Sequence, residues 1–495
     1  MNHLLQRDAA QGAFPVTDAD TANDGRVTRA AAAFVAALRP EDIPSEALHI
    51  GSRCIVDTSG LYAAGLTEES VRIIATTAAE DGGRPEALAL GAGDMRVPMA
   101  AAARVMGISA HAHDFDDTQV SHDPAHVYGL LTHPTTAPLT AALAVAHARG
   151  DVDGPRFAAA FHAGFEVSCK ISEWLRPDHY LRGHHSSGTV ATFGAAMAAG
   201  KLMNLNESQL RHALGIAVSM AAGVRCGFGT MCKPLHVGRA CENGVLAARL
   251  AARSFKGDPD ALDGRWGFAC VLAGGFSPEK TEQGFGGTWS ILDPGVSIKP
   301  YPSGILTHQA MDMVLALVER EDVDPSRVTR IDFHAGDNIL NPIRYPVAAD
   351  ALQAKFSMAA LISMLVMWRA AGLAQFTDAA VGDPAFQAMQ RKVTCHRDAE
   401  INSLGFDLIR SRVAITLDDG RTLIAEGDTR YRGGPQMPLT DAEVEGKARA
   451  CIGSLPGAED AEDAIVASAW RAMNDGPDAL LRGLAALPTI VAAPG

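Results

Sequence analysis

The order of apolar and polar residues predicts helices over most of the chain up to residue 296. From residue 28, as in "TRAAAAFVAAL", apolar residues recur at intervals of three and four, the period of an amphipathic helix. The stretch 134–150 repeats this pattern and ends on a glycine, which commonly stops a helix. Two further helices are predicted on either side of "NLNES" at 204–208, and another at 238–255. No strand is predicted between 28 and 296.

The pattern changes near residue 297. Residues 327–336, "RVTRIDFHAG", alternate in the manner of a strand. Residues 412–427 predict a hairpin, because two β-type runs flank an Asp-Gly pair. One strong helix is predicted between them, at 352–372. A capping box at Thr440 and Glu443 then begins a further helical stretch.

These patterns predict a mainly α fold. A large all-helical domain, formed by residues 28–296 and 433–495, is interrupted by a smaller α/β domain at 297–432. Residues 1–27 are polar and are predicted to form a mobile tail.

Composition and charge narrow the class of protein. The chain has 495 residues with a formal net charge of −14 and no cluster of Lys and Arg, so a nucleic-acid partner is not expected. The eight Cys are scattered without a CxxC pair, which is typical of reduced thiols in a cytoplasmic protein. The longest apolar run, at 358–368, is too short to span a bilayer, so no membrane partner is expected.

The segment 111–134 carries five His and four Asp in 24 residues, so its side chains either hold a metal or handle protons and an anionic substrate. No HExxH or tight Cys/His spacing of the kind that zinc favours is present, and no metal is predicted. His111, His122 and His126 are interpreted as solvated loop residues.

A second candidate region begins at Lys233. Because Pro234 favours the first turn of a helix, Lys233 is placed at a helix N-terminus, which disfavours its positive charge and attracts carboxylates. His236 and Arg239 follow at three-residue spacing and are predicted to face the same substrate carboxylate. The alternative is a surface lysine that caps a neighbouring element.

Two further segments carry candidate residues. Lys299 also precedes a proline, at the predicted domain boundary, where it either binds an anion or forms part of a rigid linker. His184 and His185 stand before the start of a helix rich in small residues.

Several motifs in order give the chain a family resemblance. From about residue 28 to 485 it resembles the MmgE/PrpD family, which includes 2-methylcitrate dehydratase and cis-aconitate decarboxylase. The motifs are "HDFDDT", "THP", "GHHSSGTVATFGAA", "MCKPLHVGRACENGVLAA", "KPYPSGILTHQAMD", "AKFSMA" and "DDGRT".

The resemblance implies a fold, a substrate class and a site. It implies a helical domain with a smaller α/β lid, a homodimer, small di- and tricarboxylate substrates, and catalysis that needs neither a metal nor an organic cofactor. The implied active-site positions are Asp114, Thr118, His133, Lys233 and Lys299, with His185 near the pocket.

The sequence also departs from the decarboxylase branch of this family. The spacing from "DDT" to "THP" is longer, Gly304 stands where that branch carries a histidine, and Ala360 stands where it carries a tyrosine. These differences argue against a cis-aconitate decarboxylase.

The combined prediction is a cofactor-independent lyase, most simply a hydro-lyase, that removes the proton α to a carboxylate. Lys233 and Lys299 would neutralise the enolate-like intermediate, and His133 would be the general acid or base. Asp114 would orient His133 or exchange a proton itself, and Thr118 would hydrogen-bond the substrate. The alternatives are an epimerase, isomerase or decarboxylase that uses the same pocket, and a non-catalytic carboxylate-binding or scaffold protein.

Overall fold

The computed structural model describes residues 25–120, 131–405, 409–427 and 430–491. Most of the predicted N-terminal tail lies outside these ranges. The first helix, α1 (Arg26–Ala37), starts two residues before the predicted beginning of the helical part.

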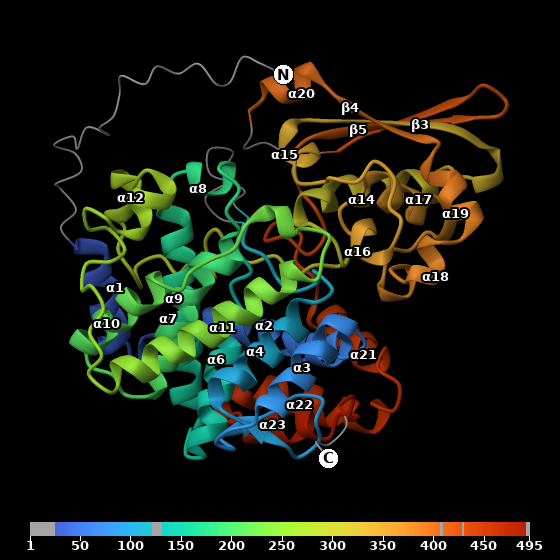
Figure 1. Cartoon of the computed structure of the whole chain (residues 1–495). Coiled ribbons are helices and arrows are strands. Elements are labelled where there is room, and N and C mark those ends of the chain that lie inside the picture. Colours follow the sequence, from blue (N-terminus) through green and yellow to red (C-terminus); the bar gives the residue numbers. More distant parts are fainter. Residues whose placement is uncertain (1–24, 121–130, 406–408, 428–429, 492–495) are drawn as a thin grey trace.

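Helices make up most of the first part of the chain (Figure 1). After α1 they are α2 (Ser45–Gly65), α3 (Glu69–Asp81), α4 (Met99–His111), α6 (Thr136–Arg149), α7 (Gly154–Trp174), α8 (Asp178–Leu181), α9 (Ser186–Leu202), α10 (Glu207–Val218), α11 (Cys232–Ala251), α12 (Phe268–Ala273) and α13 (Pro278–Thr281). The predicted break at "NLNES" is confirmed, since it separates α9 from α10.

The expectation of no strand in this part is wrong. The short strands β1 (Ala87–Leu88) and β2 (Arg96–Val97) pair antiparallel. At two residues each, they are too short to show the alternation by which a strand is recognised in a sequence.

Small residues decide how the central helices approach one another. Helix α11 packs against both α4 and α9. A Cβ on Gly107 of α4 would come within 3.1 Å of the Gly238 Cα on α11, so a larger residue would push the two helices apart. This close contact places the end of α4, at His111, beside the beginning of α11, at Lys233.

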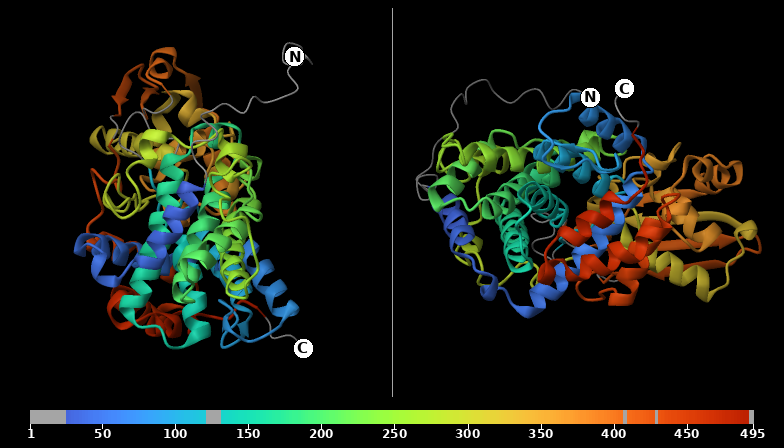
Figure 2. Two further views of the ribbon diagram at one scale, coloured as in Figure 1. Left: turned by 90° about the vertical axis from the view of Figure 1, so that its left-hand side faces the viewer. Right: turned by 90° about the horizontal axis from the view of Figure 1, so that it is seen from below.

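The C-terminal helices return to the helical part. They are α21 (Asp441–Gly453), α22 (Glu462–Asp475) and α23 (Asp478–Ala485), and α21 and α22 pack against α2. Figure 2 shows these red helices among the blue helices from the beginning of the chain. The predicted capping box is confirmed, because Glu443 N donates to Thr440 Oγ1 at 3.2 Å and Thr440 N donates to Glu443 Oε2 at 2.8 Å.

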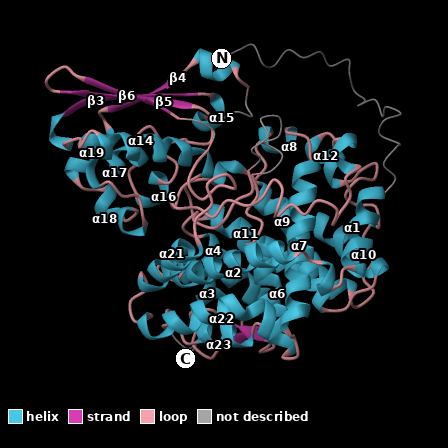
Figure 3. Ribbon diagram, turned by 180° about the vertical axis from the view of Figure 1, so that it is seen from behind, coloured by secondary structure: helices cyan, strands magenta, loops and turns pink. Residues whose placement is uncertain are grey.

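The remaining part of the chain is a mixed α/β unit. Its sheet has the order β4-β3-β5-β6, in which only the β3–β4 pair is parallel. The strands are β3 (Val328–Ala335), β4 (Val393–Arg397), β5 (Ser411–Leu417) and β6 (Thr422–Glu426), and α14 (His308–Arg320), α17 (Met358–Trp368) and α19 (Pro384–Gln390) lie along one face of the sheet (Figure 3). Shorter helices connect these elements: α15 (Asp337–Leu340), α16 (Ala351–Ala354), α18 (Asp378–Val381) and α20 (Ala399–Ser403).

The predicted strand at 327–336 and the hairpin at 412–427 are confirmed as β3 and β5–β6. The single helix predicted at 352–372 is wrong, since α16 ends at Ala354 and α17 begins at Met358. Ser357 interrupts it, because its hydroxyl accepts from the backbone N–H of Ala360 at 3.2 Å and so caps a new helix.

Two large hydrophobic clusters follow from this arrangement, one that fills the helical part and one beneath the sheet. A third, small cluster joins Leu61, Ala64, Phe115 and Cys451. The chain passes from the first to the second between Ile298 and Tyr301 and returns between Tyr431 and Leu439. The mainly α fold is confirmed, and the division into two domains at 297 and 432 stays a prediction. Within the described ranges, no helix has both the length and the apolar character needed to cross a membrane.

Candidate active site

Six of the predicted site residues line one small cavity where the helical part meets the α/β part. They are Asp114, Thr118, His133, His185, Lys233 and Lys299. The cavity has a volume of about 60 Å³, which holds a few water molecules. Its other walls are mostly apolar.

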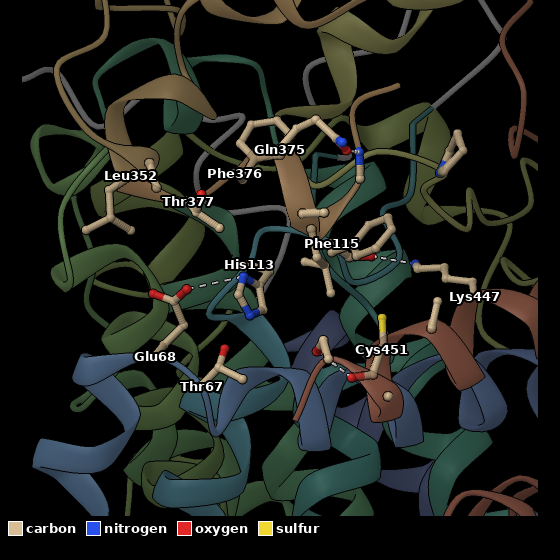
Figure 4. Close-up of a pocket in the computed structure, with 18 of the residues that line it drawn as sticks. Thr67, Glu68, His113, Phe115, Leu352, Gln375, Phe376, Thr377, Lys447 and Cys451 are labelled. Atoms are coloured by element: carbon tan, nitrogen blue, oxygen red, sulfur yellow. Dashed lines mark hydrogen bonds and ion pairs between the residues drawn. The ribbon is translucent and has the colours of Figure 1, made fainter. Parts of the chain in front are cut away.

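The backbone around Asp114 directs alternate side chains to opposite sides. Asp114 has a φ of 52°, in the left-handed region that few residues other than glycine adopt, although Asp is among those that do. Asp114 lines the small cavity, while His113 and Phe115 line a separate cleft of about 1180 Å³. Figure 4 shows His113 and Phe115 in this cleft, beside Glu68 and Lys447. The segment is therefore a thin wall between two hollows.

Asp114 is the centre of a buried charge cluster. Its Oδ1 lies 2.8 Å from the Nζ of Lys299 and 3.0 Å from the Nζ of Lys233. Burial alone would raise the pKa of Asp114, but the two ammonium groups more than offset this and hold it well below its usual range. Its Oδ2 has no hydrogen-bond partner among the described residues. Asp114 is therefore ionised and is shared by two cations.

Both lysines are buried. Lys299 is 1% exposed and also donates to the carbonyl oxygens of Asp114 and Ser303, at 2.8 and 3.1 Å. Lys233 is the second residue of α11, as predicted, and its Nζ lies 2.9 Å from His111 Nε2. Burial lowers the pKa of Lys233, and the charge of Asp114 only partly offsets this. The alternative interpretations as a surface lysine and a linker lysine are therefore wrong.

A second carboxylate orients two imidazoles. Asp116, which is fully buried, accepts from His111 Nδ1 at 2.8 Å and from the Thr136 hydroxyl at 2.8 Å, and its Oδ1 lies 3.1 Å from His133 Nδ1. Burial lowers the pKa of His133, and lowers that of His111 to about 3, so both rings are neutral near pH 7. The hydrogen-bond network thus assigns the proton of each ring to Nδ1. His133 Nε2 is left with a lone pair on the side of the cavity.

The prediction that His111 is a solvated loop residue is wrong. It ends α4, is 1% exposed, and joins Asp116 to Lys233 through its two ring nitrogens. His122 and His126, which were interpreted in the same way, lie outside the described residues.

The predicted role of Asp114 in orienting His133 is also corrected. Its Oδ1 lies 3.7 Å from His133 Nε2, too far for a hydrogen bond. Asp116 orients the ring instead. Sequence reasoning missed Asp116, because "HDFDDT" carries three carboxylates and only the fold brings one of them beside both His111 and His133.

The remaining predicted binding residues divide into two groups. Thr118 Oγ1 lies 3.4 Å from His133 Nδ1, and His185 Nδ1 lies 3.1 Å from His236 Nδ1, so His236 stands behind the wall that His185 forms. Arg239 does not line the cavity; it is half exposed and pairs with Glu242. Each three-residue step along a helix rotates by about 60° from the starting face, so Arg239 has turned away from Lys233.

The site also meets the distance requirement for a metal. One ligand atom from each of His111, Asp114, Asp116 and His133 lies within 4.8 Å of the others. However, Asp114 already contacts two ammonium groups, and His111 Nε2 contacts one of them. A metal ion would have to displace the lysines, so this donor set does not fit one. The absence of a cofactor stays a prediction.

The Asp116→Asn variant should lower kcat by about 10- to 100-fold, the range for partners that orient a functional imidazole. The charge of Asp116 raises the pKa of His133, so its removal lowers that pKa further. The basic form of His133 exists above its pKa. In a plot of kcat/KM against pH, the fall on the acid side is expected below pH 6.5 in the unmodified protein. In the variant this fall should move to lower pH. Thr136→Val, which removes only one hydrogen bond to Asp116, is the control. An unshifted acid limb would leave Asp116 with a structural role only.

Comparison with known proteins places this fold and site in a family. The model of the MmgE/PrpD N-terminal domain matches residues 29–281, and that of the MmgE/PrpD C-terminal domain matches residues 301–472. The chain belongs to the MmgE/PrpD family, which confirms the resemblance.

Several relatives are cis-aconitate decarboxylases. The chain is 27% identical to that of Homo sapiens over 437 residues, which cover 86% of this chain and 87% of the relative. It is 27% identical to that of Mus musculus, covering 86% of each chain, and 24% identical to that of Aspergillus terreus, covering 88% of this chain and 91% of the relative. Of the three departures from that branch, Gly304 lines the cavity, whereas Ala360 is buried in α17 and does not. The longer spacing from "DDT" to "THP" falls mostly on 121–130, outside the described residues.

Proposed function

We propose that the protein is a lyase that acts on a small carboxylate through proton transfer at the carbon α to the carboxyl group. One observation carries the proposal: two buried ammonium groups and an oriented imidazole nitrogen line the same cavity. Family membership and the names of the relatives support a lyase that acts on carboxylates.

The α-proton of a carboxylate is poorly acidic, because its removal leaves a dianion. In the proposed mechanism the substrate carboxylate docks beside Lys233 and Lys299, which are fixed before the reaction begins and stabilise the charge as it develops. The Nε2 of His133 takes the α-proton. The electrons left by the broken C–H bond form the enolate-like dianion.

Dehydration is the form that we favour. The dianion collapses to a carbon–carbon double bond as the C–O bond at the β-carbon breaks, and the proton on His133 leaves with the hydroxide as water. Decarboxylation is the second candidate, and the names of the relatives favour it. In that form no α-proton is removed. The bond between a carbon and its carboxyl group breaks, carbon dioxide leaves, the electron pair stays on the carbon, and a proton that His133 has taken from solvent adds to that carbon.

Incubation of the pure protein with a panel of hydroxylated and unsaturated carboxylates in deuterated water tests the proposal. Nuclear magnetic resonance would report deuterium at the α-carbon, and mass spectrometry would report loss of water or of carbon dioxide. Loss of water supports the hydro-lyase, and loss of carbon dioxide supports the decarboxylase. Deuterium uptake with inversion and no loss would indicate an epimerase. Binding without deuterium uptake for any acid would instead support a non-catalytic carboxylate-binding protein. The His133→Gln variant controls for contaminating enzymes.

A further inference from the structure

The wall between the small cavity and the large cleft is held by lysine side chains from outside the segment. Three ammonium groups each donate a hydrogen bond to a backbone carbonyl oxygen of residues 112–115. The pairs are Lys355 with Ala112 at 3.2 Å, Lys299 with Asp114 at 2.8 Å and Lys447 with Phe115 at 2.7 Å. The lysines come from three distant places: the start of α17, the passage between the two hydrophobic clusters, and α21. Hydrogen bonds from a charged donor are among the stronger ones in proteins.

This segment needs such support because of the backbone of Asp114. Its φ of 52° lies in the left-handed region, which a residue with a side chain keeps only when its surroundings fix it. A return to a negative φ would turn the side chain away from its present direction. The carboxylate would then leave Lys233 and Lys299, and these two ammonium groups would lose the negative charge that they share.

Lys447 is fixed by three contacts on the side of the large cleft. Besides its bond to the Phe115 carbonyl, its Nζ lies 3.9 Å from the centre of the Phe115 ring and 2.8 Å from Asp57 Oδ1. Asp57 is 1% exposed and belongs to α2. Figure 4 shows Lys447 reaching the Phe115 backbone across the cleft. Main chain and side chain of the residue that follows Asp114 are therefore held by one ammonium group.

We propose that Lys355 and Lys447 are positioning residues for the reaction. They fix the backbone on either side of Asp114, and neither of them lines the small cavity. The carboxylate of Asp114 thereby stays between Lys233 and Lys299, which receive the substrate. The inference rests on the proposed function and adds two residues that act on the site without touching the substrate.

The ionisation of Lys233 gives a readout that a purely structural role would not change. Burial lowers the pKa of Lys233, and the charge of Asp114 raises it, while Lys299 lowers it and Asp116 raises it. His111 Nε2 also lies 2.9 Å from its Nζ. The charged form of Lys233 exists below its pKa. If Asp114 moves away, that pKa falls further, so the fall of kcat/KM on the alkaline side should move to lower pH.

Four variants separate positioning from stability. Lys447→Met removes the bond to Phe115 but also leaves the buried carboxylate of Asp57 without its cation. The double variant Asp57→Asn/Lys447→Met removes that stranded charge as well. Asp57→Asn alone is the matched control, since its amide oxygen still accepts from Lys447. Lys447→Arg keeps the charge and the donors, and the cleft leaves room for the larger head group.

Both variants that contain Lys447→Met should lower kcat about 10- to 100-fold, as small displacements of a reacting group do, and should shift the alkaline fall to lower pH. The double variant should regain stability against urea without regaining kcat. Asp57→Asn should keep a kcat close to that of the unmodified protein, and Lys447→Arg should restore most of the loss. Lys355→Met should move the alkaline fall in the same direction.

Hydrogen exchange of a peptide over residues 112–118, measured by mass spectrometry, tests the same point without substrate. It should be faster in the double variant than in Asp57→Asn. Unchanged exchange would overturn the inference, and so would a double variant that regains both stability and kcat, because Lys447 would then serve the ion pair alone. Failure of the proposed function looks different: the unmodified protein turns over no acid, while hydrogen exchange still decides whether Lys447 holds the segment.

Discussion

The His133→Gln variant is expected to lose a factor of about 10² to 10⁴ in kcat, the usual contribution of a positioned acid or base. Glutamine can still hydrogen-bond Asp116, but its amide cannot accept the α-proton as imidazole does. Substrate affinity should stay within about tenfold, because Lys233 and Lys299 still hold the carboxylate. Steady-state kinetics and direct binding measurements separate the two quantities.

His184→Gln is the matched control, since His184 does not line the cavity. It should leave kcat close to that of the unmodified protein. Near-normal turnover in His133→Gln would assign a structural role to His133 and transfer the proton-transfer role to Asp114 or His185.

The Lys299→Met variant is expected to lower kcat/KM by the equivalent of about 2–5 kcal/mol, the range for a desolvated charge that loses its partner. Lys299 is 1% exposed and contacts Asp114 at 2.8 Å, so its loss leaves that carboxylate with Lys233 alone. Lys233→Met should lower kcat more than it raises KM, because we place Lys233 nearer the developing charge. Lys256→Met, at an exposed position, should cost well under about 1 kcal/mol.

A double-mutant cycle tests the charge cluster itself. Urea unfolding of Asp114→Asn, Lys299→Met and the double variant should give free energies that are not additive. The double variant should lose less stability than the sum of the two single variants, by about 1 kcal/mol or more, because each single variant strands the other charge. Additive losses would show that Asp114 and Lys299 do not interact strongly.

The helices and the hairpin could be predicted because their signals are local. The period of apolar residues, the Asp-Gly turn and the capping box at Thr440 each involve a few neighbouring residues. The break before α17 could not, because apolar residues continue from one helix into the next. Lys355 lies within this break, and its buried ammonium group donates to the carbonyl oxygen of Ala112, a contact that only the folded chain supplies.

The site divides in the same way. The four catalytic candidates could be predicted from their residue types, and the fold brings them to one cavity. They are Asp114, His133, Lys233 and Lys299. His111 was misread because its burial depends on the close approach of α4 to α11 at Gly107 and Gly238. Arg239 was predicted to face the substrate, because the three-residue spacing was taken to keep side chains on one face. The rotation accumulated over two such steps turns Arg239 away from Lys233.

The small volume of the cavity has a consequence for the rate of association. A ligand pocket is commonly several hundred Å³, and a carboxylic acid with several carbon atoms needs more room than about 60 Å³. The cavity must therefore enlarge before such an acid can enter. At high concentrations of substrate, association can proceed no faster than this enlargement. The observed rate constant of binding should therefore level off at the rate at which the cavity enlarges, below the limit set by diffusion.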